Sequence, residues 1–231
     1  MLRVAFCISG RGRLARSALA CRTALGFKPV LILTDEKADP SLEPFAQDVG
    51  TPFVRLDVHD RPRFDRDLEA ACVHATPDLI VLTFDKLVPA SLVARFPHAI
   101  VNVHLSLLPA FRGFGALRAA LEAGVKFAGA TLHLVGTDVD GGPIITQGVV
   151  PVRADDTPAA LGTRIYGRLL PMYLQVLAWY AAGRVWHDTA GRVWIRDADY
   201  GDCLTCPAIE PGVAALARRL SETPEEVNPH P

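Results

Sequence analysis

Short, uninterrupted apolar runs alternate with amphipathic segments through the N-terminal part of the chain, and this alternation limits the folds open to it. The apolar runs cover residues 2–8, 29–33, 52–56, 79–83 and 99–104, whereas residues 14–25, 39–49, 63–74 and 91–96 have the periodicity of helices. Continuously apolar strands separated by helices are typical of a parallel sheet with helices on both faces. We therefore predict an α/β fold with a mostly parallel, twisted, Rossmann-like sheet.

The pattern changes after residue 128. Residues 130–135 and 143–150 predict two strands joined by a turn at 138–142. Residues 157–180 predict a long helix, with Asp156 or Thr157 as the N-cap and Pro158 in the first turn. Ala190-Gly191 between two short strand-like runs predicts a C-terminal hairpin. We assign residues 1–200 to one domain and 201–231, which end in a Pro- and Glu-rich stretch, to a partly flexible tail.

Composition excludes several classes of protein. The net charge of −1 gives no overall field to attract nucleic acid or an anionic membrane. Five cysteines at scattered spacings fit a reducing cytosol better than a disulfide framework. The start lacks a signal-peptide pattern, and no uncharged stretch is long enough to span a bilayer. We expect a cytoplasmic protein with neither nucleic acid nor membrane as a partner, and a homodimer through late apolar helix faces stays open.

Three polar residues lie near the end of one predicted strand and within a later predicted turn. Asn102 and His104 lie two apart, so they share one face of a strand near its carboxyl end, where open α/β sheets bind ligands. Asp140 precedes Gly-Gly-Pro, and Asp138 is its rival. An amide, an imidazole and a carboxylate can stabilise an oxyanion and accept a proton in acyl transfer. Taken alone, the Asn102–His104 pair favours a buried structural role, but the flanking Ser106, residues 107–109 and residues 112–113 favour a functional one.

A second candidate site follows the first predicted strand. The turn there contains Gly10, Arg11, Gly12 and Arg13, and a predicted helix begins directly after it. Glycines let a backbone approach a ligand, and a helix N-terminus favours an anion. The two arginines favour a phosphate or carboxylate. The third glycine of a dinucleotide-binding pattern is missing, so a simple tight turn is the alternative.

Two motifs together resemble the folate-dependent formyltransferases. They are VNVHLSLLPAFRG, from residue 101, and GATLHLVGTDVDGGPIITQ, from residue 129. The resemblance implies the formyltransferase fold and makes residues 1–200 the catalytic domain. It also implies a 10-formyltetrahydrofolate co-substrate, a small-molecule amine acceptor and no metal. The branch that the chain looks most similar to acts on glycinamide ribonucleotide in purine synthesis.

The resemblance also implies roles for individual residues. It makes Asn102, His104 and Asp140 the catalytic residues and assigns Gly10, Arg11, Gly12, Arg13 and Ser106 to the substrate. Two segments would bind the folate co-substrate: Phe84, Asp85, Lys86 and Leu87 in the first, and Val135, Gly136, Thr137 and Asp138 in the second.

Departures from the purine branch leave the acceptor open. Arg11 replaces an Asn, Asp85-Lys86 replaces Met-Arg, and the long helix lacks a substrate-contacting Glu in the stretch from Ile165 to Pro171. The alternatives are N-formylation of another amine, such as an amino sugar or amino acid, hydrolysis of formyltetrahydrofolate, and folate binding without catalysis. The family's hydrolase usually carries an extra N-terminal domain, and the start of this chain at the first strand counts against it.

Two further features have simpler interpretations. Cys203 and Cys206 form a CxxC without a second ligand pair, which favours ordinary thiols over a metal or redox site. His133 alternates with apolar neighbours on a predicted strand beside the site. A satisfied structural histidine is the favoured interpretation.

Overall fold

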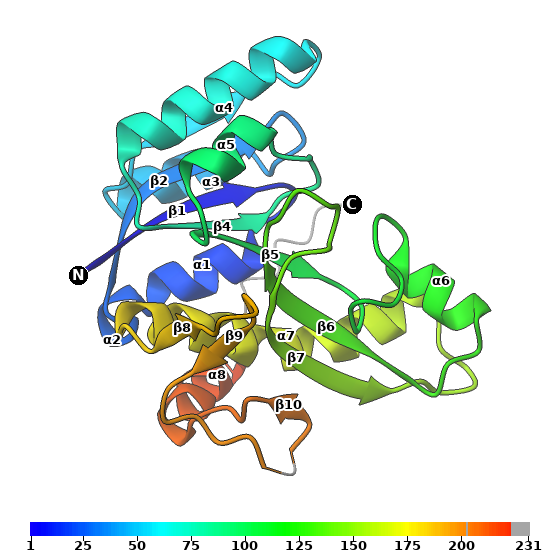
Figure 1. The fold of residues 1–231 in the computed structure, drawn as a ribbon. Coiled ribbons are helices and arrows are strands. Elements are labelled where there is room, and N and C mark those ends of the chain that lie inside the picture. Colours follow the sequence, from blue (N-terminus) through cyan, green and yellow to red (C-terminus); the bar gives the residue numbers. More distant parts are fainter. Residues whose placement is uncertain (202, 223–231) are drawn as a thin grey trace.

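The computed structural model describes residues 1–201 and 203–222, and its central feature is an eight-stranded sheet (Figure 1). Strands β1 to β5 pair with one another in parallel, and β6, β7 and β10 extend the sheet beyond β5 through antiparallel pairs. The predicted mostly parallel α/β sheet is therefore confirmed. The order across the sheet is β10 (Thr205–Cys206), β7 (Ile144–Pro151), β6 (Phe127–Leu134), β5 (Ile100–His104), β4 (Leu79–Thr83), β1 (Leu2–Ile8), β2 (Phe27–Asp35) and β3 (Phe53–Leu56).

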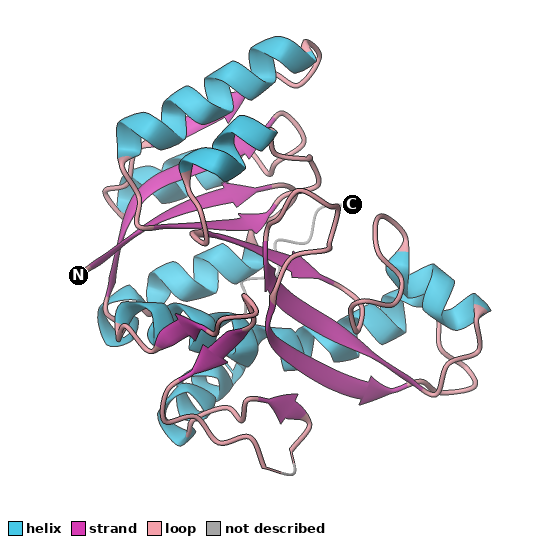
Figure 2. Cartoon of the chain, viewed as in Figure 1, coloured by secondary structure: helices cyan, strands magenta, loops and turns pink. Residues whose placement is uncertain are grey.

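Helices cover both faces of the sheet, as Figure 2 shows. The periodicity of β1 explains why: Val4, Phe6 and Ile8 join one buried cluster, whereas Ala5 and Cys7 join the other. A strand whose side chains are apolar on both faces must be covered on both. The helices are α1 (Arg13–Ala20), α2 (Arg22–Leu25), α3 (Leu42–Asp48), α4 (Arg61–Ala75), α5 (Ala90–Arg95), α6 (Ala116–Glu122), α7 (Pro158–Ala181) and α8 (Pro211–Glu222).

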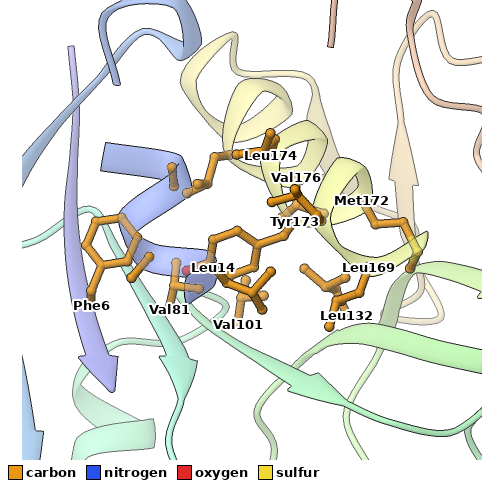
Figure 3. Packing of buried hydrophobic residues seen from close by; sticks show 14 of the residues in the cluster. Phe6, Leu14, Val81, Val101, Leu132, Leu169, Met172, Tyr173, Leu174 and Val176 are labelled. Carbon is orange, nitrogen blue, oxygen red and sulfur yellow. The ribbon is translucent and has the colours of Figure 1, made fainter. Parts of the chain in front are cut away.

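Helix α7 forms much of the larger cluster. Figure 3 shows its buried Leu169, Met172 and Tyr173 beside sheet residues that include Val101 and Leu132. Because α7 begins near the β7 end of the sheet and also contacts β2, it ties the antiparallel and parallel halves together. The opposite face is covered by α4 and α5.

Several boundaries differ from the sequence-based expectation. Residues 14–25 form two helices instead of one, because Cys21 adopts φ −107° and ψ 9° between α1 and α2. Thr157 is the N-cap of α7, and its hydroxyl accepts a hydrogen bond from the N–H of Ala160. The C-terminal hairpin is confirmed as β8 (Val185–His187) paired with β9 (Val193–Ile195).

The expected tail contributes to the fold. Strand β10 pairs with β7, and α8 packs against α7 through buried Val213 and Ala217. Neither element was anticipated, nor was α6. Residues 202 and 223–231 lie outside the described residues, so the flexibility expected of the end of the tail stays a prediction. None of the described helices is long and apolar enough to cross a membrane.

Candidate active site

The candidate site lies at the carboxyl edge of the parallel strands, where the strand order reverses. Strand β1 pairs with β2 on one side and with β4 on the other. The topological switch point therefore lies between the carboxyl ends of β1 and β4. Ser9 follows β1, and the segment from Phe84 follows β4. His104 is the last residue of β5, the next strand. The strand order thus brings the predicted loops to one edge.

Asn102, His104 and Asp140 come together at this edge. Nδ1 of His104 lies 3.3 Å from Oδ2 of Asp140, and Nδ2 of Asn102 lies 3.4 Å from Oδ1 of the same carboxylate. The side chains of His104 and Asp140 are only 10% and 11% exposed. The trio predicted from the sequence is therefore one contiguous, largely desolvated group. Its rival Asp138 is exposed.

Each ring nitrogen of His104 faces an oxygen. Nε2 lies 2.7 Å from the main-chain carbonyl oxygen of Phe111, and Nδ1 faces Asp140. A carbonyl and a carboxylate oxygen accept hydrogen bonds but do not donate them, so both contacts are satisfied when both ring nitrogens carry hydrogen. The arrangement is complementary to a positively charged imidazolium. The Phe111 carbonyl was not anticipated, because no side-chain pattern marks a main-chain acceptor.

A tight turn holds Asp140. Its φ of 49° is left-handed, and its Oδ2 accepts a hydrogen bond of 2.8 Å from the main-chain N–H of Gly113. Behind it, a Cβ on Gly142 would lie 1.9 Å from the carbonyl oxygen of Leu134, so only glycine fits. The Gly-Gly-Pro that marked this turn in the sequence is needed for the backbone to pass this close.

His133 lies against the trio from β6, opposite Asn102 in the strand register. Its Nδ1 lies 2.8 Å from the Leu134 carbonyl oxygen and must donate, which leaves Nε2 to accept from Nδ2 of Asn102 at 3.3 Å. Burial lowers the pKa of His133 and outweighs the carbonyl and Asp140, which raise it. The histidine is satisfied, as expected, but it also contacts the candidate catalytic amide, which the sequence did not indicate.

The glycine turn lines a cavity of about 310 Å³. Gly12 has a left-handed φ of 66° and caps α1 without a side-chain hydrogen bond, so the first N–H groups of the helix have no side-chain cap. The guanidinium of Arg13 lies 4.2 Å from the centre of the Tyr166 ring, on α7. The lining residues are Ser9, Arg11, Gly12, Arg13, Leu14, Thr83 and Tyr166. The sequence analysis missed Tyr166.

The two segments assigned to the folate co-substrate both adjoin one buried cluster. Phe84 and Val135 pack against the same buried cluster under α4 and α5. Leu87 is 50% exposed and Val139, in the loop between β6 and β7, is 51% exposed. Gly136 is half-buried, and Thr137 and Asp138 are exposed. The two segments thus present apolar side chains and loop backbone at the same edge as the trio.

Other predicted residues fall elsewhere. Ser106 is buried, and its hydroxyl donates to the Ala110 carbonyl at 2.6 Å, so it shapes the loop after His104 instead of facing the site. Cys203 and Cys206 are exposed free thiols in the segment around β10. Among the described residues, no group of three or more His, Cys, Asp and Glu side chains is arranged to hold a metal ion.

Comparison with known proteins gives the family. A family model described as formyl transferase matches residues 2–177, and the chain belongs to this family. It is 31% identical over 195 residues to phosphoribosylglycinamide formyltransferase of Escherichia coli (strain K12), with 82% of this chain and 92% of that protein covered. The resemblance inferred from the two motifs is confirmed.

Two further relatives extend the comparison. Glycinamide ribonucleotide transformylase 1 from Symbiobacterium toebii superposes with a TM-score of 0.78 at 35% identity, over 85% of this chain and 95% of that one. Trifunctional purine biosynthetic protein adenosine-3 of Gallus gallus is 31% identical over 200 residues, which are 83% of this chain. The chain spans only 20% of that protein's length.

Proposed function

We propose that this protein transfers a formyl group from 10-formyltetrahydrofolate to the amine of glycinamide ribonucleotide or a closely related anionic amine. The observation that carries the proposal is the contiguous group of Asn102, His104 and Asp140 at the carboxyl edge of the sheet. The relatives named for phosphoribosylglycinamide formyltransferase support the choice of donor and acceptor. No step of this chemistry calls for a metal.

The reaction begins when the neutral acceptor amine attacks the formyl carbon, whose carbonyl oxygen becomes an oxyanion. Nδ2 of Asn102 is the donor to this oxyanion. Its contacts of 3.3 and 3.4 Å to His133 and Asp140 are long for N–H hydrogen bonds, so one of them can be exchanged for a hydrogen bond to the oxyanion. Because Nε2 of His104 already donates to Phe111, His104 acts through the positive charge of its ring.

The proton released by the attacking amine goes to Asp140, directly or through one water. The same carboxylate keeps the His104 imidazolium in place, and the Gly113 N–H fixes its orientation. When the tetrahedral intermediate collapses, the bond from the formyl carbon to N10 of the folate breaks. N10 takes up the proton, which gives tetrahydrofolate and the formylated amine.

The donor fits the side of the site formed by the segments after β4 and β6. A pterin ring needs a flat apolar surface and main-chain hydrogen-bond groups at its edge. Phe84, Leu87 and Val135 supply the apolar surface, and the backbone of residues 135–138 supplies the polar groups.

The acceptor fits the cavity beside the glycine turn. Arg11 and Arg13 line it together with the N-terminus of α1, and both features favour an anion. The stack of Arg13 on Tyr166 fixes the guanidinium in one orientation. A phosphate held there leaves the rest of the acceptor to extend along the edge toward Asn102.

A different anionic amine is the second candidate acceptor. It is favoured by the stretch from Ile165 to Pro171 on α7, which lacks the Glu that contacts the substrate in the purine branch. Hydrolysis of the donor and folate binding without turnover are the remaining alternatives.

The test is the release of tetrahydrofolate from 10-formyltetrahydrofolate, followed by absorbance with and without glycinamide ribonucleotide. Turnover that requires the ribonucleotide is the expected result. Turnover without any amine would make the protein a hydrolase. No turnover in either case would lead to a panel of phosphorylated and carboxylated amines, and failure of the whole panel with intact folate binding would overturn the proposal.

A further inference from the structure

The strand order places the residues that follow β4 between the two halves of the site. Strand β4 pairs with β1 on one side and with β5 on the other. The arginine-containing turn follows β1, and the catalytic trio is built around the end of β5. With strands roughly 5 Å apart, a molecule that reaches from the turn to the trio must cross the end of β4. Thr83, the last residue of β4, already lines the arginine-containing cavity.

Asp85 stands at this crossing point and is held in a fixed position. Its N–H donates a hydrogen bond of 3.2 Å to the hydroxyl oxygen of Ser9, and its Oδ1 lies 3.0 Å from the same oxygen. Ser9 itself lines the cavity. Lys86 forms an ion pair with Oδ1 of Asp85. Within residues 1–201 and 203–222, protein groups contact only Oδ1 of this carboxylate, and the side chain is still 48% exposed.

The other carboxylate of this cluster is not accessible. Asp35, at the end of β2, is completely buried. It accepts from the hydroxyl of Ser9 at 2.7 Å and from the N–H of Lys37 at 3.0 Å, and Lys86 lies 3.3 Å from it. Asp35 thus neutralises Lys86 from the protein interior, whereas Asp85 is exposed to solvent. Burial would raise the pKa of the Asp85 carboxyl, but the hydrogen bond and the positive charge of Lys86 outweigh it, and its pKa lies below the usual value.

The site consequently has a positive end and a negative middle. Arg11 and Arg13 attract a phosphate at one end. An ionised carboxylate with a free oxygen accepts hydrogen bonds from hydroxyl groups, and a sugar carries hydroxyls at a short distance from its phosphate. The reacting amine must be neutral and meets its own proton acceptor at Asp140, so it is not the group that Asp85 is placed to bind.

We propose that Asp85 is a specificity-determining residue for the acceptor, and that its free carboxylate oxygen accepts hydrogen bonds from the hydroxyls of a sugar phosphate. This proposal rests on the proposed function and deepens it, because it states what the acceptor carries between its phosphate and its amine. It also moves Asp85 from the folate side, where the resemblance placed it, to the acceptor side.

The first experiment measures binding without catalysis. Ribose 5-phosphate and 2-deoxyribose 5-phosphate are titrated into the wild-type protein and the Asp85→Asn variant by calorimetry. We expect the wild type to bind ribose 5-phosphate more tightly, and Asp85→Asn to lose roughly tenfold or more for ribose 5-phosphate and much less for the deoxy sugar. Equal binding of the two sugars by the wild type would overturn the proposal, whatever the turnover assay gives.

The second experiment separates the acceptor from the donor. In the tetrahydrofolate-release assay, Asp85→Asn should raise the KM for glycinamide ribonucleotide and leave kcat and the KM for the folate close to wild type. A rise in the folate KM alone would return Asp85 to the donor side and contradict the proposal. Absent turnover with the ribonucleotide in the wild type would contradict the proposed function, while the sugar-binding result would still decide the role of Asp85.

Two variants guard against trivial outcomes. Glu36→Gln removes an exposed carboxylate next to Asp35 and should change neither sugar binding nor either KM. Asp85→Ser provides a smaller replacement should Asp85→Asn fold poorly. Because Lys86 keeps Asp35 as an ion-pair partner, we expect both Asp85 variants to unfold at a temperature close to that of the wild type.

Discussion

Nδ1 of His104 lies 3.3 Å from Oδ2 of Asp140, and this contact joins the end of β5 to the loop between β6 and β7. The two residues come from the two sequence motifs that identify the family. Their contact depends on the antiparallel pairing of β5 with β6, which brings the end of β6 back beside β5. The carboxylate serves both the imidazole and the neighbouring amide, so changes to any of the three should be felt mainly in the chemical step.

Asn102→Ala should leave the protein folded and nearly inactive. Loss of one oxyanion donor typically costs ~10²–10³ in turnover. The measurement is kcat in the tetrahydrofolate-release assay, with thermal unfolding as the check on folding. Wild-type turnover in this variant would remove Asn102 from the catalytic group.

Asp140→Asn should lower kcat by about 10²–10⁴, the usual contribution of a general base. The amide can still accept from the Gly113 N–H, but it carries no charge for His104 and accepts no proton. Asp138→Asn, in the same loop but exposed, is the matched comparison and should lose no more than a few-fold. The opposite ranking of the two variants would make Asp138 the catalytic carboxylate.

Arg13→Ala should raise the KM for the acceptor by roughly ten- to a hundredfold, because a hydrogen bond to a charged group is lost. The folate KM should stay near wild type. Tyr166→Leu, which removes the ring under the guanidinium but keeps the charge, should give a smaller rise. The exposed Arg66 on α4 provides a control for the loss of one positive charge. An unchanged acceptor KM in Arg13→Ala would place the anion elsewhere.

Stability should fall as the pH drops through the ordinary pKa of histidine, and His133 should account for part of the loss. Burial lowers its pKa in the folded state, so below about pH 6.5 the unfolded chain binds more protons than the folded one. Urea unfolding between pH 8 and pH 5 should show a shallower pH dependence of the unfolding free energy for His133→Gln. His74→Gln, at an exposed position, should retain the wild-type slope.

Gly167→Ala should stabilise the protein by about 1 kcal/mol, since glycine in a helix interior is less favourable than alanine. Gly167 lies within α7, and a Cβ there would meet nothing within 4 Å. Gly162→Ala on the same helix should gain less, because its Cβ would lie 3.3 Å from Cδ1 of Leu117. The unfolding temperature of Gly167→Ala should rise by roughly 2–4 °C. A decrease would indicate that the glycine is needed for packing.

The amino-acid sequence by itself determined the alternation of strands and helices, the trio of Asn102, His104 and Asp140, and the anion-favouring turn around Arg13. Local patterns predict these features: apolar runs of strand length, residues two apart on one face, and glycines at turns. The same patterns placed one helix over residues 14–25, where the backbone breaks at Cys21. They gave no sign of α6, α8 or the two-residue β10.

Tertiary structure decided what surrounds those residues. The Phe111 carbonyl at His104, the His133 ring at Asn102 and the Tyr166 ring under Arg13 all come from segments that meet only when strands pair and α7 packs on the sheet. The position of Asp85 between the turn and the trio depends on the pairing of β4 with β1 instead of β3. Local sequence patterns do not predict such contacts. They depend on the strand order, which is determined by how the whole chain buries both faces of the sheet.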